Sequence, residues 1–167
     1  MPEKQTTERA RKAKSKGKAP TTQAGEFVRE EIHHVREGKH GARSPQQAIA
    51  IGLSKARRAG VELPPPKKGT VSERTREQAA RDTAKGRRST TSKPSGTRSR
   101  AVRGALKREG SSAASRQALG TQAKRVARKR TAAERSASAR KGAQSRTHAE
   151  RSASARKAAR TRARRAH

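Results

Sequence analysis

Arginine recurs at every fifth position within each of two runs near the C-terminus, and its side chain is well suited to binding phosphate. The positions are Arg130, Arg135, Arg140, Arg146, Arg151 and Arg156. A guanidinium group donates two parallel hydrogen bonds to a phosphate. Five residues on a helix turn by about 140° and rise by roughly 7.5 Å, so these groups spiral round the axis. An all-round distribution favours contact with phosphates from several strands over a helix laid in a single groove.

The surrounding basic residues enlarge this candidate nucleic-acid site. The full set is Lys124, Arg125, Arg128, Lys129, Arg130, Arg135, Arg140, Lys141, Arg146, Arg151, Arg156, Lys157, Arg160, Arg162, Arg164 and Arg165. The segment has no aromatic residue on which bases could stack and no Trp, Phe or Leu opposite a basic face. It therefore predicts phosphate contact without base specificity, and no membrane binding.

Charge dominates the second half of the chain. Residues 83–167 carry 26 Lys or Arg against three Glu, about +23 of the total +32. Only 28% of all residues are hydrophobic and Phe27 is the single aromatic. High net charge with little apolar surface is typical of disorder. We therefore expect a mostly α, largely disordered chain.

Other classes of function lack the residues they need. No paired carboxylates, phosphate-binding Gly-rich loop or nucleophile–base set is present, so we expect no enzyme and no cofactor. His33, His34 and His40 could suggest a metal, but there is no Cys and the sequence shows no well-placed carboxylate, so we expect no metal site. With no apolar run for a signal peptide or membrane span, we expect a soluble protein of the cytoplasm, located at the nucleoid.

Composition divides the chain into four parts. We expect a basic disordered arm over 1–20, a helical hairpin over 21–63, a flexible basic linker with a short helix over 64–110, and an Ala/Arg-rich tail over 111–167. The hairpin segment holds nine of the chain's fifteen Val, Ile, Leu, Met and Phe residues and is nearly neutral. At about 40 residues it is near the lower limit for folding alone, so we expect either self-association through it or marginal stability.

Two helices are predicted in the hairpin. Thr21 or Thr22 can cap the first, which has apolar residues at helical spacing: Phe27 or Val28, Ile32 and Val35. The second begins with Ser44, Pro45 and Gln47, a capping box with proline at the first helical position, and ends near Gly60. A helix-turn-helix is the alternative, with Gln46 and Gln47 at bases. The long connection and the basic residues at the second helix's C-terminal end favour plain packing.

The tail contains a repeat with a period of 16 residues. RTAAERSASARKGA at 130–143 matches RTHAERSASARKAA at 146–159 in 12 of 14 positions. Each copy opens with a capping box, Thr131 with Glu134 and Thr147 with Glu150. Because the arginines repel one another, we expect these helices to be partly melted in the free protein and to fold on phosphate.

The block TTQAGEFVREEIHHVREGKHGARSPQQAIAIGLSKARRAGVELPPPKKG resembles a family of small, strongly basic bacterial proteins of unknown function. The segments SSAASRQALGTQAKRVARKR and ARKAARTRARRA resemble the C-terminal part of that family. Members often carry a DNA-binding label given for their composition. The resemblance implies a bacterial source and carries over no active site. The tail is also similar in composition to histone-like tails.

Three functions follow as expectations. The leading one is a histone-like, nucleoid-associated protein that binds duplex DNA without sequence preference, neutralising and bridging phosphate backbones. The first alternative is a basic protein associated with RNA or the ribosome, because both backbones present phosphates. The second is a protein-interaction or stress protein whose tail only localises it.

Overall fold

The computed structural model describes residues 2–88 and 95–166. These residues form eight α-helices and one short 3-10 helix. The elements are α1 (Lys4–Ser15), α2 (Pro20–Arg36), α3 (Pro45–Arg58), α4 (Glu73–Arg88), α5 (Gly96–Lys107), η1 (Ser112–Ala114), α6 (Arg116–Arg128), α7 (Ala132–Gln144) and α8 (His148–Ala166). The expectation of a mostly α chain is confirmed, and that of a largely disordered chain is wrong.

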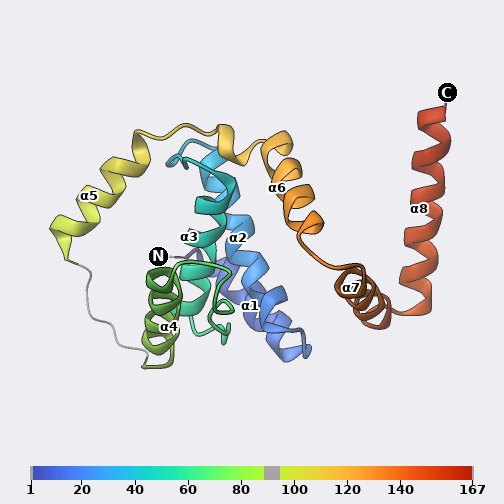
Figure 1. Ribbon diagram of the computed structural model, residues 1–167, viewed down its shortest axis with the longest axis horizontal. Coiled ribbons are helices and arrows are strands. Elements are labelled where there is room, and N and C mark those ends of the chain that lie inside the picture. The colour runs from blue at the N-terminus through green and yellow to red at the C-terminus, as the bar shows by residue number, and fades with distance from the viewer. Residues whose placement is uncertain (1, 89–94, 167) are drawn as a thin grey trace. The chain divides into compact units, whose positions relative to one another are not determined.

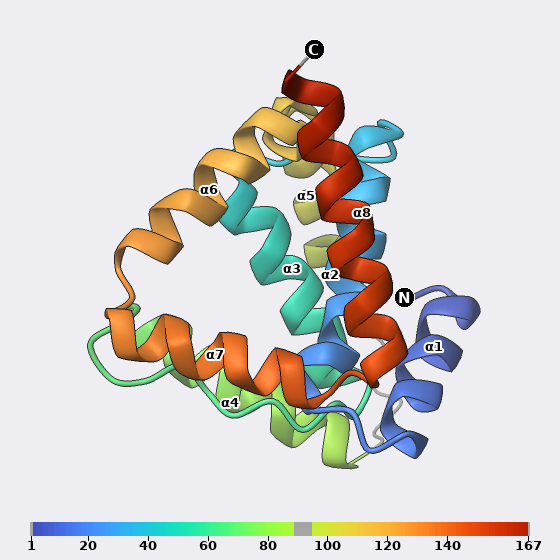
Figure 2. The ribbon, with the colours of Figure 1, turned by 90° about the vertical axis from the view of Figure 1, so that its right-hand side faces the viewer.

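The chain divides into two compact units, residues 1–122 and 123–167. In unit 1, α2 and α3 lie side by side, α1 packs on α2, and α4 packs on α3 (Figure 1). The short helix η1 contacts both α2 and α3. Unit 2 contains the end of α6 together with α7 and α8, each a continuous helix (Figure 2).

The core of unit 1 is built largely from small residues. One cluster joins Phe27 to alanines of α1, α2 and α3 and to Val61 and Leu63. A second joins Val35 to Ala42, Ala48 and the η1 alanines Ala113 and Ala114. The scarcity of large apolar side chains in the sequence led us to underestimate the size of this core, because alanine supplies much of it. Alanine lets helices approach closely, so the apolar contacts do not require bulky residues.

The N-terminal segment is a packed helix where we expected a disordered arm. Thr6 and Ala10, one turn apart on α1, are both buried. The Glu3 backbone N–H donates to the Glu30 carboxylate of α2 at 3.3 Å, and Arg9 pairs with Glu26 at 3.0 Å. Short-range contacts with two acidic residues of α2 therefore hold this basic segment in place.

The region of the expected linker also differs from the prediction. It contains α4, which covers the predicted short helix, and α5. Gly41 N–H donates to Leu106 O at 2.8 Å, and Ala42 N–H donates to Gly110 O at 3.0 Å. Residues 89–94 of the expected linker lie outside the described part of the chain.

Several local signals read from the sequence are confirmed. Ser44 Oγ accepts from Gln47 N–H at 3.2 Å, Pro45 is the first residue of α3, and Gly60 follows the helix with φ +87°. The Gln47 side chain, however, accepts from the Arg43 N–H at 2.8 Å. The start predicted for the first helix at Thr21 or Thr22 is wrong, because Pro20 already occupies the first helical position. No helix in the described ranges combines the length and apolarity that crossing a bilayer requires.

Candidate nucleic-acid interface

Unit 2 presents its cationic side chains to solvent. All sixteen residues of the predicted set fall in this unit: three on α6, two between α6 and α7, three on α7, one between α7 and α8, and seven on α8. Fifteen have described side chains, and all fifteen are exposed. Arg165 belongs to α8, and its side chain is outside the described part. None of the described side chains of the unit is buried.

The two Glu residues of unit 2 are engaged at helix starts. Glu134 Oε2 accepts from Thr131 N–H at 2.9 Å, and Thr131 Oγ1 accepts from Glu134 N–H at 3.2 Å. The same reciprocal pair joins Thr147 and Glu150, at 2.8 and 3.2 Å. Both predicted capping boxes are confirmed. The carboxylates therefore satisfy backbone donors where helix dipoles favour negative charge.

We expected these helices to be partly melted, whereas in the structure α7 and α8 are continuous helices. Alanine and arginine are strong helix formers, and each helix carries its own complete cap. At the turn between α6 and α7, Arg135 Nη1 donates to Arg130 O at 2.8 Å and to Ala127 O at 3.5 Å. The carbonyls at the end of α6 thus offset part of the guanidinium charge.

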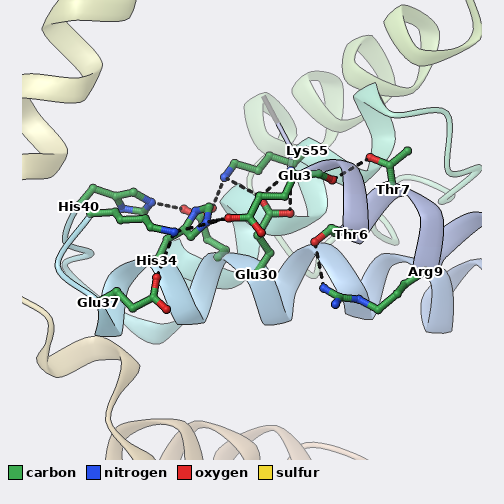
Figure 3. Close-up of polar contacts among 11 residues, drawn as sticks. Glu3, Thr6, Thr7, Arg9, Glu30, His34, Glu37, His40 and Lys55 are labelled. Atoms are coloured by element: carbon green, nitrogen blue, oxygen red, sulfur yellow. Dashed lines mark hydrogen bonds and ion pairs between the residues drawn. The ribbon is translucent and has the colours of Figure 1, made fainter.

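A buried polar network in unit 1 was missed by sequence reasoning. Figure 3 shows it around the end of α2, where Glu31 is fully buried. Lys55 Nζ of α3 lies 2.5 Å from Glu31 Oε2, and His40 Nε2 lies 3.1 Å from Glu31 Oε1. Neither contact is aligned as a hydrogen bond, so both oxygens lack a hydrogen-bond donor in the described residues. Lys55 therefore compensates this carboxylate through charge, without good hydrogen-bond geometry, and His40 faces its other oxygen.

The rim of this network is more exposed. His34 Nε2 donates to Glu3 Oε1 at 2.9 Å, and this hydrogen bond is the main reason that the pKa of Glu3 lies below its ordinary value. Lys39 lies 3.1 Å from Glu37, whose hydrogen bond raises the pKa of that lysine. A signal was present in the sequence: Glu31 precedes His34 by three residues, so one helix face carries both.

A second polar contact joins α3 to α4. The buried Asp82 carboxylate accepts from Ser54 Oγ at 2.6 Å, Arg58 Nε at 2.8 Å and Gln78 Nε2 at 3.1 Å. Beside it, burial lowers the pKa of Arg57, and Arg57 Nε has no hydrogen-bond acceptor among the described residues. Arg57 lies in the last turn of α3 and is buried although its side chain is charged.

The basic surface and the buried network belong to different units. The described histidines and carboxylates that converge most closely are in unit 1, and the predicted phosphate contacts are in unit 2. Gln46, considered as a base contact, is exposed on the first turn of α3, and Gln47 accepts from Arg43 N–H. The Gln47 side chain thus serves the start of its helix.

Comparison with known proteins gives one match. Residues 11–68 match the model of a family of unknown function (DUF6496), about a third of the chain. The matched segment runs from α1 through α3 and ends before α4. Its description fits the unknown function of the family that the sequence resembles and includes no DNA-binding label. Neither a curated protein nor a solved structure matches the chain.

Proposed function

We propose that this protein binds duplex DNA through its phosphate backbone, without sequence preference, as a nucleoid-associated protein. The observation that carries the proposal is the exposure of the fifteen described cationic side chains in unit 2. Sixteen Lys or Arg stand there against two Glu, and both Glu are engaged in caps. A surface with this excess of positive charge attracts polyanions and releases their counterions on binding.

The absence of base-reading chemistry supports the non-specific form. The described part of unit 2 is mostly arginine, lysine, alanine and serine, with no Phe, Trp or Tyr for stacking. Its arginines spiral round two separately capped helices, which favours contact with phosphates on more than one side. Bridging of duplexes would follow from this arrangement.

The salt dependence of binding tests the proposal. If about ten phosphates are contacted, log K falls with log salt at a slope near −9. Fluorescence anisotropy with two unrelated duplexes of equal length, at several salt concentrations, measures the slope for the full chain. A flat salt response, or a strong preference for one duplex, would contradict the proposal.

A matched pair of variants locates the interface. One replaces Arg151, Arg156, Arg160, Arg162 and Arg164 of α8 with Gln. The control replaces five exposed basic residues of α1 and its C-cap with Gln: Lys4, Arg11, Lys12, Lys14 and Lys16. We expect the α8 variant to lose about 4 to 5 units of slope and the α1 variant clearly less. Equal losses would show that unit 2 is not the interface.

RNA is the alternative ligand, since RNA and DNA both present a phosphate backbone to the cationic side chains. An RNA duplex as competitor distinguishes RNA from DNA binding, because a preference for RNA of tenfold or more would overturn the DNA assignment.

Self-association through 21–63 stays a prediction. In the structure, α1, α4 and η1 of the same chain pack against the hairpin helices α2 and α3, which covers part of the surface that self-association would bury.

A further inference from the structure

We propose that Glu31, His34 and His40 form a binding site for a divalent transition metal of the Zn²⁺ class. One ligand atom from each residue lies within 4.8 Å of the other two, and all three residues are buried or half-buried. Two imidazole nitrogens with one carboxylate oxygen are a donor set that zinc and its neighbours bind. No function proposed for unit 2 uses these residues.

Local structure brings the three ligands together. Glu31 and His34 are three residues apart on α2, so they share one helix face. Helix α2 ends at Arg36, and Gly38, with φ +70°, lets the chain turn so that His40 returns to the same face. His33, beside His34 on the helix, is exposed and is not part of the cluster.

The hydrogen bond of His40 leaves its other nitrogen available to a metal. His40 Nδ1 lies 3.1 Å from Gly41 O, and because a carbonyl only accepts, Nδ1 carries the proton. In the neutral ring Nε2 then carries a lone pair, and this nitrogen lies 3.1 Å from Glu31 Oε1. Two electron-rich atoms this close in a buried place require a cation between them, either a proton or a metal ion.

The remaining contacts support the ligands. Glu3 Oε1 accepts from His34 Nε2 at 2.9 Å, and this hydrogen bond holds the orientation of the ring. In the neutral ring the lone pair that could bind a metal is then on Nδ1. Lys55 lies on Glu31 Oε2 and leaves Oε1 for the ion.

The local charge also favours a cation. Glu3, Glu30, Glu31 and Glu37 surround the cluster against two ammonium groups, Lys39 and Lys55, so the site is acidic within a chain of net charge +32. A bound metal would join the end of α2 to the connection that leads into α3. Because it binds the folded state, it would also raise the stability of unit 1.

The test is a titration of the metal-free full chain with Zn²⁺ against a colorimetric chelator, with Mg²⁺ as the hard-cation comparison. We expect one Zn²⁺ per chain and no competition by Mg²⁺, which prefers oxygen ligands. Co²⁺ in place of Zn²⁺ should give the visible absorption bands of a low-coordinate, nitrogen-containing site.

Single substitutions separate this site from adventitious binding by histidine. His34→Gln and His40→Gln should each weaken Zn²⁺ binding by about tenfold or more, whereas His33→Gln, one residue away and exposed, should leave it unchanged. Circular dichroism checks that each variant is folded, and His40→Gln, outside any helix, carries the test if His34→Gln unfolds. Absence of Zn²⁺ binding by the wild type, or an equal loss in His33→Gln and His40→Gln, would overturn the proposal.

Discussion

Gly52 of α3 lies so close to Val28 of α2 that a Cβ atom at position 52 would stand 2.7 Å from the Val28 Cα. It would also stand 3.0 Å from the Phe27 carbonyl oxygen. The neighbouring atoms are backbone and cannot move aside without displacing a helix. The separation of the two central helices of unit 1 thus depends on a missing side chain.

We therefore expect Gly52→Ala to destabilise unit 1 by about 1–3 kcal/mol, since an overpacked contact must shift the helices. Gly25→Ala is the matched control, because Gly25 is exposed within α2 and a Cβ there would meet nothing within 4 Å. It should be neutral or stabilising by up to about 1 kcal/mol. Urea unfolding followed by circular dichroism measures both, and equal stabilities of the two variants would contradict the close contact.

Removing the Asp82 side chain should separate α4 from α3. Asp82→Ala leaves Ser54 and Arg58 without their acceptor, and we expect a loss of about 2 kcal/mol or more in the free energy of unfolding. Glu77→Ala on the same helix removes an exposed pair with Arg81 and should cost less than about 0.5 kcal/mol. Thermal unfolding of both variants at one pH is the measurement. A smaller effect at Asp82 than at Glu77 would refute this role.

The position of a truncation should decide whether unit 1 remains intact. A chain ending at residue 122 keeps η1, so we expect its unfolding midpoint to match that of the full chain. A chain ending at residue 110 loses the buried Ala113 and Ala114, and the hydrogen bond from Arg36 Nε to Ala114 O at 2.8 Å. It should be less stable by at least about 1 kcal/mol. Equal midpoints would mean that η1 contributes nothing to the core.

The shorter deletion is also the right one for testing protein interaction. A chain lacking 123–167 that keeps its partner but loses DNA affinity would favour the interaction alternative. Deletion from residue 111 would confuse that result with damage to unit 1.

The caps of the repeat can be tested one at a time. Thr131→Ala removes the hydroxyl that accepts from the Glu134 N–H at 3.2 Å. A lost N-cap costs about 1 kcal/mol, so hydrogen exchange at the Glu134 amide should become about fivefold faster. Thr131→Ser keeps the hydroxyl and should preserve the wild-type rate, as should the Glu150 amide of α8 in either variant. An unchanged rate at Glu134 in Thr131→Ala would show that the cap does not protect α7.

Local signals in the sequence were more informative than composition. Ser44 with Pro45, and Thr131 with Glu134, act within one helical turn, so their spacing alone predicted the helix starts. The burial of Ala113 and Ala114 against Val35 depends on residues almost 80 positions apart, and no local periodicity contains it. Net charge predicted disorder because it treats every lysine and arginine as unpaired, whereas Arg58 and Lys55 face carboxylates in unit 1.

The candidate metal site also combines a local sequence signal with a contact that the sequence does not show. Adjacent histidines on a helix point apart, which argued against a metal. His33 and His34 do not converge, but Glu31 lies three residues before His34, which places Glu31 and His34 on one face. The return of His40 depends on the turn after α2, which the sequence indicated only as a break at Gly38.

The 16-residue repeat has a consequence for how this protein can vary. One period, such as residues 130–145, contains a helix start with its own threonine and glutamate, a helix that buries nothing, and four cations. Inserting or losing one period would add or remove a self-sufficient helix without exposing any apolar surface. Selection could therefore lengthen or shorten the cationic part in equal steps, and unit 1 would fold unchanged at each length.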